Sequence, residues 1–264
     1  MVWRSSRFLL LLGPLARGLL YFMLLMAVSQ GLVALNASMS PAIPWFPVPA
    51  LALIAAGTLW VRRRWDIRLN HPPGVPWGKA YAFACLTTYA AICISALEAW
   101  YHDLVRPAPL WPGEEVSTVF QLSFLIVLPF IASVLAEVGF RGIIQTQFEK
   151  LLPLWPMLLL IAVINTLMHF YDPEQGSQWL RFIALNLSFG YVTWRTQSIF
   201  PALTAHILMN VFEPLARYLS EQYGAGPLLF GNLPPGALAM VGTSGLVAFA
   251  LALYIGKYLP PGPG

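Results

Sequence analysis

The stretch Ser117–Phe148, which reads STVFQLSFLIVLPFIASVLAEVGFRGIIQTQF, decides the fold class of this chain. Its residues from Ser117 to Ala136 include no charged side chain. A run of roughly 20 mostly apolar residues is long enough for a helix to cross a bilayer. The stretch is therefore predicted to be a transmembrane helix. Because it continues to Phe148, beyond what one crossing requires, we expect this helix to tilt or break.

Similar apolar runs recur along the whole chain. Apolar residues make up 58% of the 264 positions and charged residues only 10%, whereas a soluble domain carries roughly 25% charge. The sequence therefore predicts an all-α, polytopic membrane protein of about eight transmembrane helices, built as a single integral-membrane domain over residues 1–264. The predicted helices cover about 15–35, 45–61, 79–97, 117–148, 154–170, 179–194, 199–212 and 237–258.

Basic residues predict the orientation of these helices, because short cytoplasmic connections carry an excess of Lys and Arg. With eight crossings, most of the basic residues between helices fall on one side, and the connection around Glu98–Glu115 falls on the other. Both termini are therefore predicted to be cytoplasmic. Because the net charge of +4 arises mainly from these helix ends, no nucleic-acid partner is expected. The residues on the predicted cytoplasmic side are Arg4, Arg7, Arg62, Arg63, Arg64, Arg68, Lys150, Arg195 and Lys257.

Four ionisable side chains stand out inside or at the end of apolar runs, one of them with an asparagine four residues later. Each ionisable group near the bilayer centre costs about 2.5 to 3.5 kcal/mol on insertion scales, so it needs a partner or a function. Glu137 and Arg141 are four residues apart, which allows an ion pair on one helical face. His206 and Asn210 repeat that spacing, and His169 closes the fifth run. An ion pair and polar contacts between helices are the structural alternatives to a catalytic role.

Together these groups have the chemistry of a hydrolytic site. One carboxylate, two imidazoles and a carboxamide on three helices can activate a water molecule or bind a divalent metal. Asn165, one turn before His169, faces the same way and can join the cluster. Glu137, His169 and His206 could supply three ligands to zinc, but the chain lacks a short-range ligand pair such as HExxH, and a metal-free mechanism without a cofactor is expected.

These residues carry a resemblance to a known family. Glu137 with Phe140-Arg141-Gly142, His169 about thirty residues later, and the stretch Ser198-Ile-Phe-Pro-Ala-Leu-Thr-Ala-His206-Ile-Leu-Met-Asn210 resemble the CPBP intramembrane proteases. This family includes the CAAX prenyl endopeptidases and abortive-infection proteins. The resemblance covers a motif-bearing core of about 117–215. It implies that a glutamate and His169 activate the hydrolytic water, while His206 and Asn210 stabilise the oxyanion, with Arg141 and Asn165 in support.

Two positions depart from the family pattern. The first motif of the family is a Glu-Glu pair followed by three residues and Arg, and the first glutamate, usually the catalytic one, is Ala136 here. Asn165 stands where the family commonly has Phe. Either Glu137 serves as the base after a modest rotation of the helix, or the chain is a weakened or inactive relative.

Three functions follow from these patterns. The first is an intramembrane endopeptidase that cleaves a membrane-associated peptide or protein by direct attack of water, because no serine or cysteine beside a histidine offers a nucleophile. The second is a non-catalytic relative that binds a membrane partner, which Ala136 favours. The third is a transporter, against which stands the lack of paired broken helices in the two halves. The expected location is the inner (plasma) membrane of a bacterium.

Overall fold

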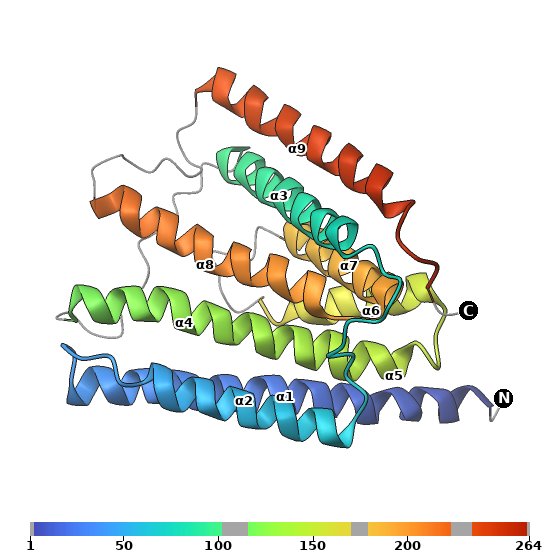
Figure 1. The fold of residues 1–264 in the computed structure, drawn as a ribbon, viewed down its shortest axis with the longest axis horizontal. Helices are drawn as coiled ribbons and strands as arrows, with labels where there is room; N and C mark the ends of the chain where they lie inside the picture. Colours follow the sequence, from blue (N-terminus) through green and yellow to red (C-terminus); the bar gives the residue numbers. More distant parts are fainter. Residues whose placement is uncertain (1–2, 102–115, 170–178, 223–233, 263–264) are drawn as a thin grey trace. The chain divides into compact units, whose positions relative to one another are not determined.

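The computed structural model describes residues 3–101, 116–169, 179–222 and 234–262, and these residues are almost entirely helical (Figure 1). Every predicted transmembrane window overlaps helix in the structure, and the described residues contain no β-strand, so the all-α prediction is confirmed. The elements are α1 (Trp3–Met39), α2 (Pro47–Arg64), α3 (Trp77–Tyr101), α4 (Thr118–Ala136), η1 (Glu137–Gln145), α5 (Thr146–Phe148), α6 (Leu154–Leu167), α7 (Trp179–Thr196), α8 (Phe200–Gln222) and α9 (Pro235–Gly256).

Among the described residues, four stretches of helix are long and apolar enough to cross a membrane: Leu10–Met39, Trp77–Glu98, Thr118–Phe148 and Pro235–Gly256. Helix α6 is also apolar but shorter. The protein is therefore a polytopic integral-membrane protein, as predicted. Much of the connection at Glu98–Glu115, on which the predicted orientation partly depends, lies outside the described residues. The orientation of the termini stays a prediction.

The chain divides into two compact units. Unit 1 comprises residues 1–69, 109–152 and 207–215, and unit 2 comprises residues 70–108, 153–206 and 216–264. Helices α1, α2 and α4 with η1 belong to unit 1, whereas α3, α6, α7 and α9 belong to unit 2. Helix α8 contributes residues to both. The prediction of one integral-membrane domain is not tested by this division and stays a prediction.

In unit 1, a buried asparagine closes the turn between α1 and α2. The Asn36 side chain accepts hydrogen bonds from the backbone N–H groups of Trp45 and Phe46, and its amide donates to the carbonyls of Ser40 and Ile43. These bonds satisfy backbone groups at the helix ends, which otherwise lack partners. The ring of Phe46 then packs on Phe120 of α4 at a centroid distance of 5.5 Å, which joins the three helices into one core.

In unit 2, helix α9 lies along α3 through small residues (Figure 1). A Cβ placed at Gly245 would lie 2.7 Å from the Cβ of Cys93, so glycine permits this close approach. Small residues of this kind let membrane helices pack tightly where lipid provides little hydrophobic driving force. Cys93 and Cys85 are both free thiols. The segment after α9 is held to α7 by Arg195, which donates to the carbonyls of Leu259 and Pro260.

Candidate active site

The predicted break in the fourth helix takes the form of a π-helix. Helix α4 ends at Ala136, and the next nine residues, Glu137–Gln145, form η1, in which every residue is buried. A π-helix bonds i to i+5, and short π segments inside α-helices occur frequently at functional sites. Gly139 and Gly142 lie within this segment and have a low intrinsic preference for the α-helix. The carboxylate of Glu137 therefore stands at the point where the helix changes its hydrogen-bonding pattern.

The ion pair expected from the spacing of Glu137 and Arg141 is present. The Oε1 atom of Glu137 lies 3.2 Å from the Nη1 atom of Arg141, and the two side chains are 0% and 1% exposed. In a low-dielectric interior such a pair offsets much of the cost of burying each charge, and losing either partner leaves the other charge buried. Ala136, which stands before this pair, is 7% exposed and contributes only a methyl group.

Asn210 lies against the helix that carries Glu137. Its Nδ2 donates to the Oγ of Ser133 at 3.1 Å, and Ser133 donates in turn to the Pro129 carbonyl at 2.8 Å. Ser133 is one helical turn before Glu137, so both side chains project from the same side of the helix. The bond to Ser133 uses one N–H of the Asn210 amide, and the amide carries a second.

In unit 2, His169 and Asn165 contact α7. His169 lies in the turn that follows α6, two residues after the helix ends, and not within the helix as its predicted range implied. Its ring stacks on Phe182 with centroids 4.2 Å apart and planes 7° from parallel. The buried Asn165 accepts a 3.3 Å hydrogen bond from the Nδ2 of Asn186, which also donates to the Phe182 carbonyl. An asparagine side chain of α7 therefore holds Asn165 in place.

His206 also contacts α7, through Phe189 at a centroid distance of 5.5 Å. Phe182, Asn186 and Phe189 are spaced four and three residues apart, so they occupy one face of α7. This face touches His169, Asn165 and His206 in turn. Sequence reasoning missed it, although a polar Asn186 within an apolar run is a signal that could have found it. Ser133 was also missed, because serine is common in membrane helices and gives no periodic signal.

The predicted site residues thus fall into two described sets. Unit 1 holds Glu137, Arg141 and Asn210, and Asn210 is hydrogen-bonded to Ser133, one turn before Glu137. Unit 2 holds Asn165, His169 and His206, which all contact one face of α7. The meeting of both sets in one cavity stays a prediction. Within each unit, the described residues include no group of three His, Cys, Asp or Glu side chains close enough to hold a metal ion.

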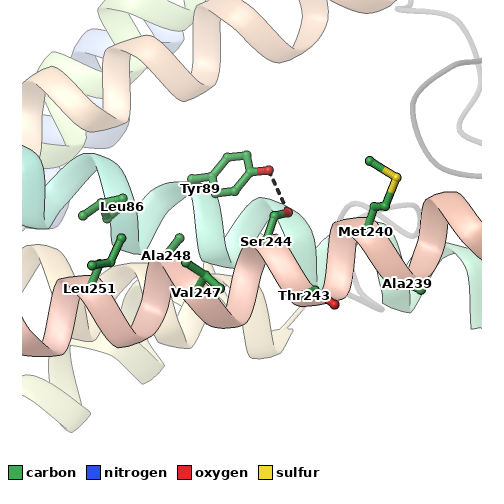
Figure 2. Close-up of a pocket in the computed structure, with 9 residues that line it drawn as sticks. All are labelled: Leu86, Tyr89, Ala239, Met240, Thr243, Ser244, Val247, Ala248 and Leu251. Carbon is green, nitrogen blue, oxygen red and sulfur yellow. Dashed lines mark hydrogen bonds between the residues drawn. The ribbon is translucent and has the colours of Figure 1, made fainter.

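A groove of about 610 Å³ opens between α3 and α9 of unit 2 (Figure 2). It is largely apolar; its lining includes the hydroxyls of Thr243, Tyr89 and Ser244, and the last two share a 2.9 Å hydrogen bond. None of the predicted site residues lines it. Both helices are long and apolar, and the groove offers no charged group for catalysis. Its lining residues are Leu86, Tyr89, Ala239, Met240, Thr243, Ser244, Val247, Ala248 and Leu251.

The fold and these buried groups define an all-helical membrane protein with a paired carboxylate inside a π-helix. Residues 118–212 match the family model described as type II CAAX prenyl endopeptidase Rce1-like. The match spans Glu137, His169, His206 and Asn210, and over residues 118–212 it confirms the resemblance to the CAAX-type proteases that the motifs predict. Comparisons with curated proteins and with solved structures find no match.

Proposed function

We propose that this protein is an intramembrane endopeptidase that hydrolyses a peptide bond in a membrane-associated peptide or protein. The observation that carries the proposal is the Glu137 carboxylate, which is 0% exposed within the Rce1-like segment and stands at the first residue of a π-helix. A buried carboxylate inside a membrane helix is costly, so its presence favours a function. The family match supports the peptidase class.

In the proposed mechanism, Glu137 and His169 orient a water molecule, and Glu137 accepts its proton. The water oxygen bonds to the carbonyl carbon, and the electron pair of the carbonyl moves onto its oxygen. His206 and the second N–H of Asn210 then donate hydrogen bonds to this oxyanion, which preorganised donors stabilise strongly in a dry site. When the C–N bond breaks, Glu137 returns the proton to the leaving amine. No covalent intermediate with the protein is formed.

The mechanism uses neither a metal nor another cofactor. The alternative is a zinc site in which Glu137, His169 and His206 supply three ligands and a water occupies the fourth position. Prolonged dialysis against a chelator separates the two mechanisms. The metal-free mechanism requires the cleavage rate to be unchanged, whereas loss of cleavage that returns on adding zinc would establish the alternative.

A second function is favoured by Ala136 and by the 3.2 Å pair between Glu137 and Arg141. If this pair engages the carboxylate fully, the chain has no acid free to act as base at the first motif. The protein would then be a non-catalytic relative that binds a membrane partner. Both functions use the same fold, and they differ in whether Glu137 takes a proton from water.

Three proteins, each reconstituted in liposomes with a farnesylated CAAX peptide, separate these functions. If Glu137 is the base, the unmodified protein cleaves, Glu137→Gln loses about 10² to 10⁴-fold in rate, and Ala136→Glu adds little. If the carboxylate is held by Arg141, only Ala136→Glu cleaves, because its side chain projects about 100° away from Glu137.

A relative with the Glu-Glu motif serves as the positive control for the substrate. All three proteins must also show the same thermal unfolding in detergent, because Glu137→Gln leaves Arg141 as a buried charge and can destabilise by about 3 to 5 kcal/mol. Folded proteins that all leave intact a peptide cleaved by the positive control would overturn the peptidase proposal and support partner binding.

The proposed location is the inner membrane of a bacterium, with both termini in the cytoplasm. Its support is the excess of basic residues in the connections that would face inward, including the exposed Arg62, Arg63 and Arg64 at the end of α2. Labelling of single cysteines in spheroplasts tests this arrangement. A cysteine at position 64 that reacts with a membrane-impermeant reagent from outside would contradict it.

A further inference from the structure

A strained corner of the chain lies beside the π-helix in unit 1. Arg68 has a φ of +53°, in the left-handed region that residues with a Cβ rarely adopt. Such a conformation persists only where surrounding contacts hold it. The corner follows the exposed end of α2, and Ile67 beside it is 1% exposed. Contacts of Ile67 and Arg68 with the π-helix and the residues after it are therefore expected to hold this conformation.

Arg68 forms an ion pair with Glu149, which lies shortly after the π-helix. Its guanidinium binds the carboxylate of Glu149 through both terminal nitrogens, with Nη1 at 2.8 Å from Oε1. The two side chains are 10% and 9% exposed, so water screens this bidentate pair weakly. Glu149 Oε1 also accepts a 3.0 Å hydrogen bond from the Nε2 of Gln145, the last residue of η1. Arg68 is therefore linked through Glu149 to the C-terminal end of the π-helix.

Ile67 makes the second contact. A Cβ placed at Gly142 would lie 3.1 Å from the Cβ of Ile67 and 3.4 Å from its carbonyl oxygen, so the corner packs directly on the π-helix backbone. Thr146 adds a local contact, because its hydroxyl donates to the carbonyl of Gly142 at 2.7 Å. The corner thus touches η1 at Gly142 and, through Glu149, at Gln145.

The π-helix needs such contacts because its pattern is less favourable than the α-helix it interrupts. A π turn holds about one residue more than an α turn, so reversion to an α-helix would rotate Glu137 relative to Gln145 by on the order of 100° per turn. The direction of Glu137 and Arg141 therefore depends on keeping η1 in its π form.

We propose that Ile67, Arg68 and Glu149 form a clamp that keeps residues 137–145 in the π form and so positions Glu137. Arg68 and Glu149 are positioning residues, since they act on the site through Gln145 and Gly142. The catalytic consequence rests on the proposed peptidase function, whereas the structural consequence does not. The experiment therefore measures both.

The variants are Arg68→Gln, Glu149→Gln and the double substitution, in the full-length protein reconstituted in liposomes. Arg64→Gln is the matched control, because it removes the same charge from an exposed position at the end of α2, four residues earlier. Amide hydrogen exchange of the peptide covering 137–149 reports the clamp without any activity. Cleavage of the farnesylated CAAX peptide, analysed as kcat and KM, reports the position of Glu137.

Either single substitution should speed exchange in residues 137–149 by about tenfold while leaving α3 and α9 unchanged. The value of kcat should fall about tenfold with KM within twofold, because a small displacement of a catalytic group lowers the rate and not the binding. The double substitution should be no worse than either single one, since both remove one interaction. Arg64→Gln should match the unmodified protein.

Arg68→Lys keeps the charge but loses the two-pronged geometry, so it serves as the milder variant if Arg68→Gln does not fold. It should speed exchange in the same peptide by a smaller factor. Unchanged exchange at 137–149 in a folded Arg68→Lys or Glu149→Gln protein overturns the clamp, as does faster exchange spread over all helices. If the unmodified protein is inert while exchange rises locally, the peptidase proposal fails and the clamp stands.

Discussion

The π-helix η1 and helix α9 both pack through glycines, but the contact of η1 encloses charged side chains and the contact of α9 does not. In η1, Gly139 faces the backbone of Gly18 on α1, and the enclosed residues include the Glu137–Arg141 ion pair. In α9, Gly245 faces Cys93 of α3, and the opposite side of the helix is exposed and apolar. Close approach of helices alone therefore does not make a site. In η1 it encloses charges that need a partner, whereas in α9 it joins two apolar spans.

The largest effect is expected where η1 meets α1. A Cβ at Gly18 would lie 2.8 Å from the Gly139 carbonyl oxygen and would collide with the side chain of Ile144. Gly18→Ala should therefore cost about 3 kcal/mol of unfolding free energy, measured by denaturation in mixed micelles, and should lower cleavage per folded molecule. Gly31→Ala is the control, because a Cβ there meets nothing within 4 Å. Equal stability of the two variants would refute the close contact.

A smaller effect is expected in α9. A Cβ at Gly245 would lie 2.7 Å from the Cβ of Cys93, whereas one at Gly242 would have its nearest contact at 3.7 Å. Gly245→Ala should cost about 1 to 2 kcal/mol relative to Gly242→Ala, because α3 and α9 can separate slightly. Cleavage per folded molecule should be unchanged. A loss of cleavage as large as that of Gly18→Ala would show that the two glycine contacts do not differ in function.

The smallest effect is expected in the groove of Figure 2, where Tyr89 and Ser244 share a hydrogen bond. Hydrogen bonds between membrane helices contribute about 0.6 kcal/mol on average. Tyr89→Phe should therefore lower the midpoint of thermal unfolding only slightly, and Ser244→Ala should match it. Cleavage should not change, since the groove holds no charged side chain. Loss of cleavage in Tyr89→Phe would assign the groove a part in substrate binding.

The helices were predictable from the sequence. A segment that crosses lipid must satisfy its backbone hydrogen bonds internally, as a helix does, so a long run of apolar side chains indicates a helix. The pairing of Glu137 with Arg141 was also predictable, since a spacing of four residues places side chains on one face. The π form of residues 137–145 was not, because the same spacing is compatible with both helix types. Local sequence carries no information on whether tertiary contacts favour the rarer one.

Contacts between distant residues could not be predicted from one sequence. Arg68 and Glu149 are 81 residues apart, and each alone is typical of a charged residue near a helix end. Asn186 was visible only as a polar residue in an apolar run, without the partner Asn165 that explains it. Asn210 was assigned by the motif, while its contact with Ser133 depends on how α8 meets α4 in unit 1.

The most direct test of the central claim is the cleavage rate of the farnesylated CAAX peptide by the unmodified protein and by the double variant Glu137→Gln/Arg141→Gln in liposomes. The double variant removes both charges of the buried pair, so it leaves no unpaired ion to unfold the protein. We expect the unmodified protein to cleave and the double variant to lose about 10² to 10⁴-fold in rate at unchanged stability. Equal rates of cleavage would contradict the role of Glu137 as the base.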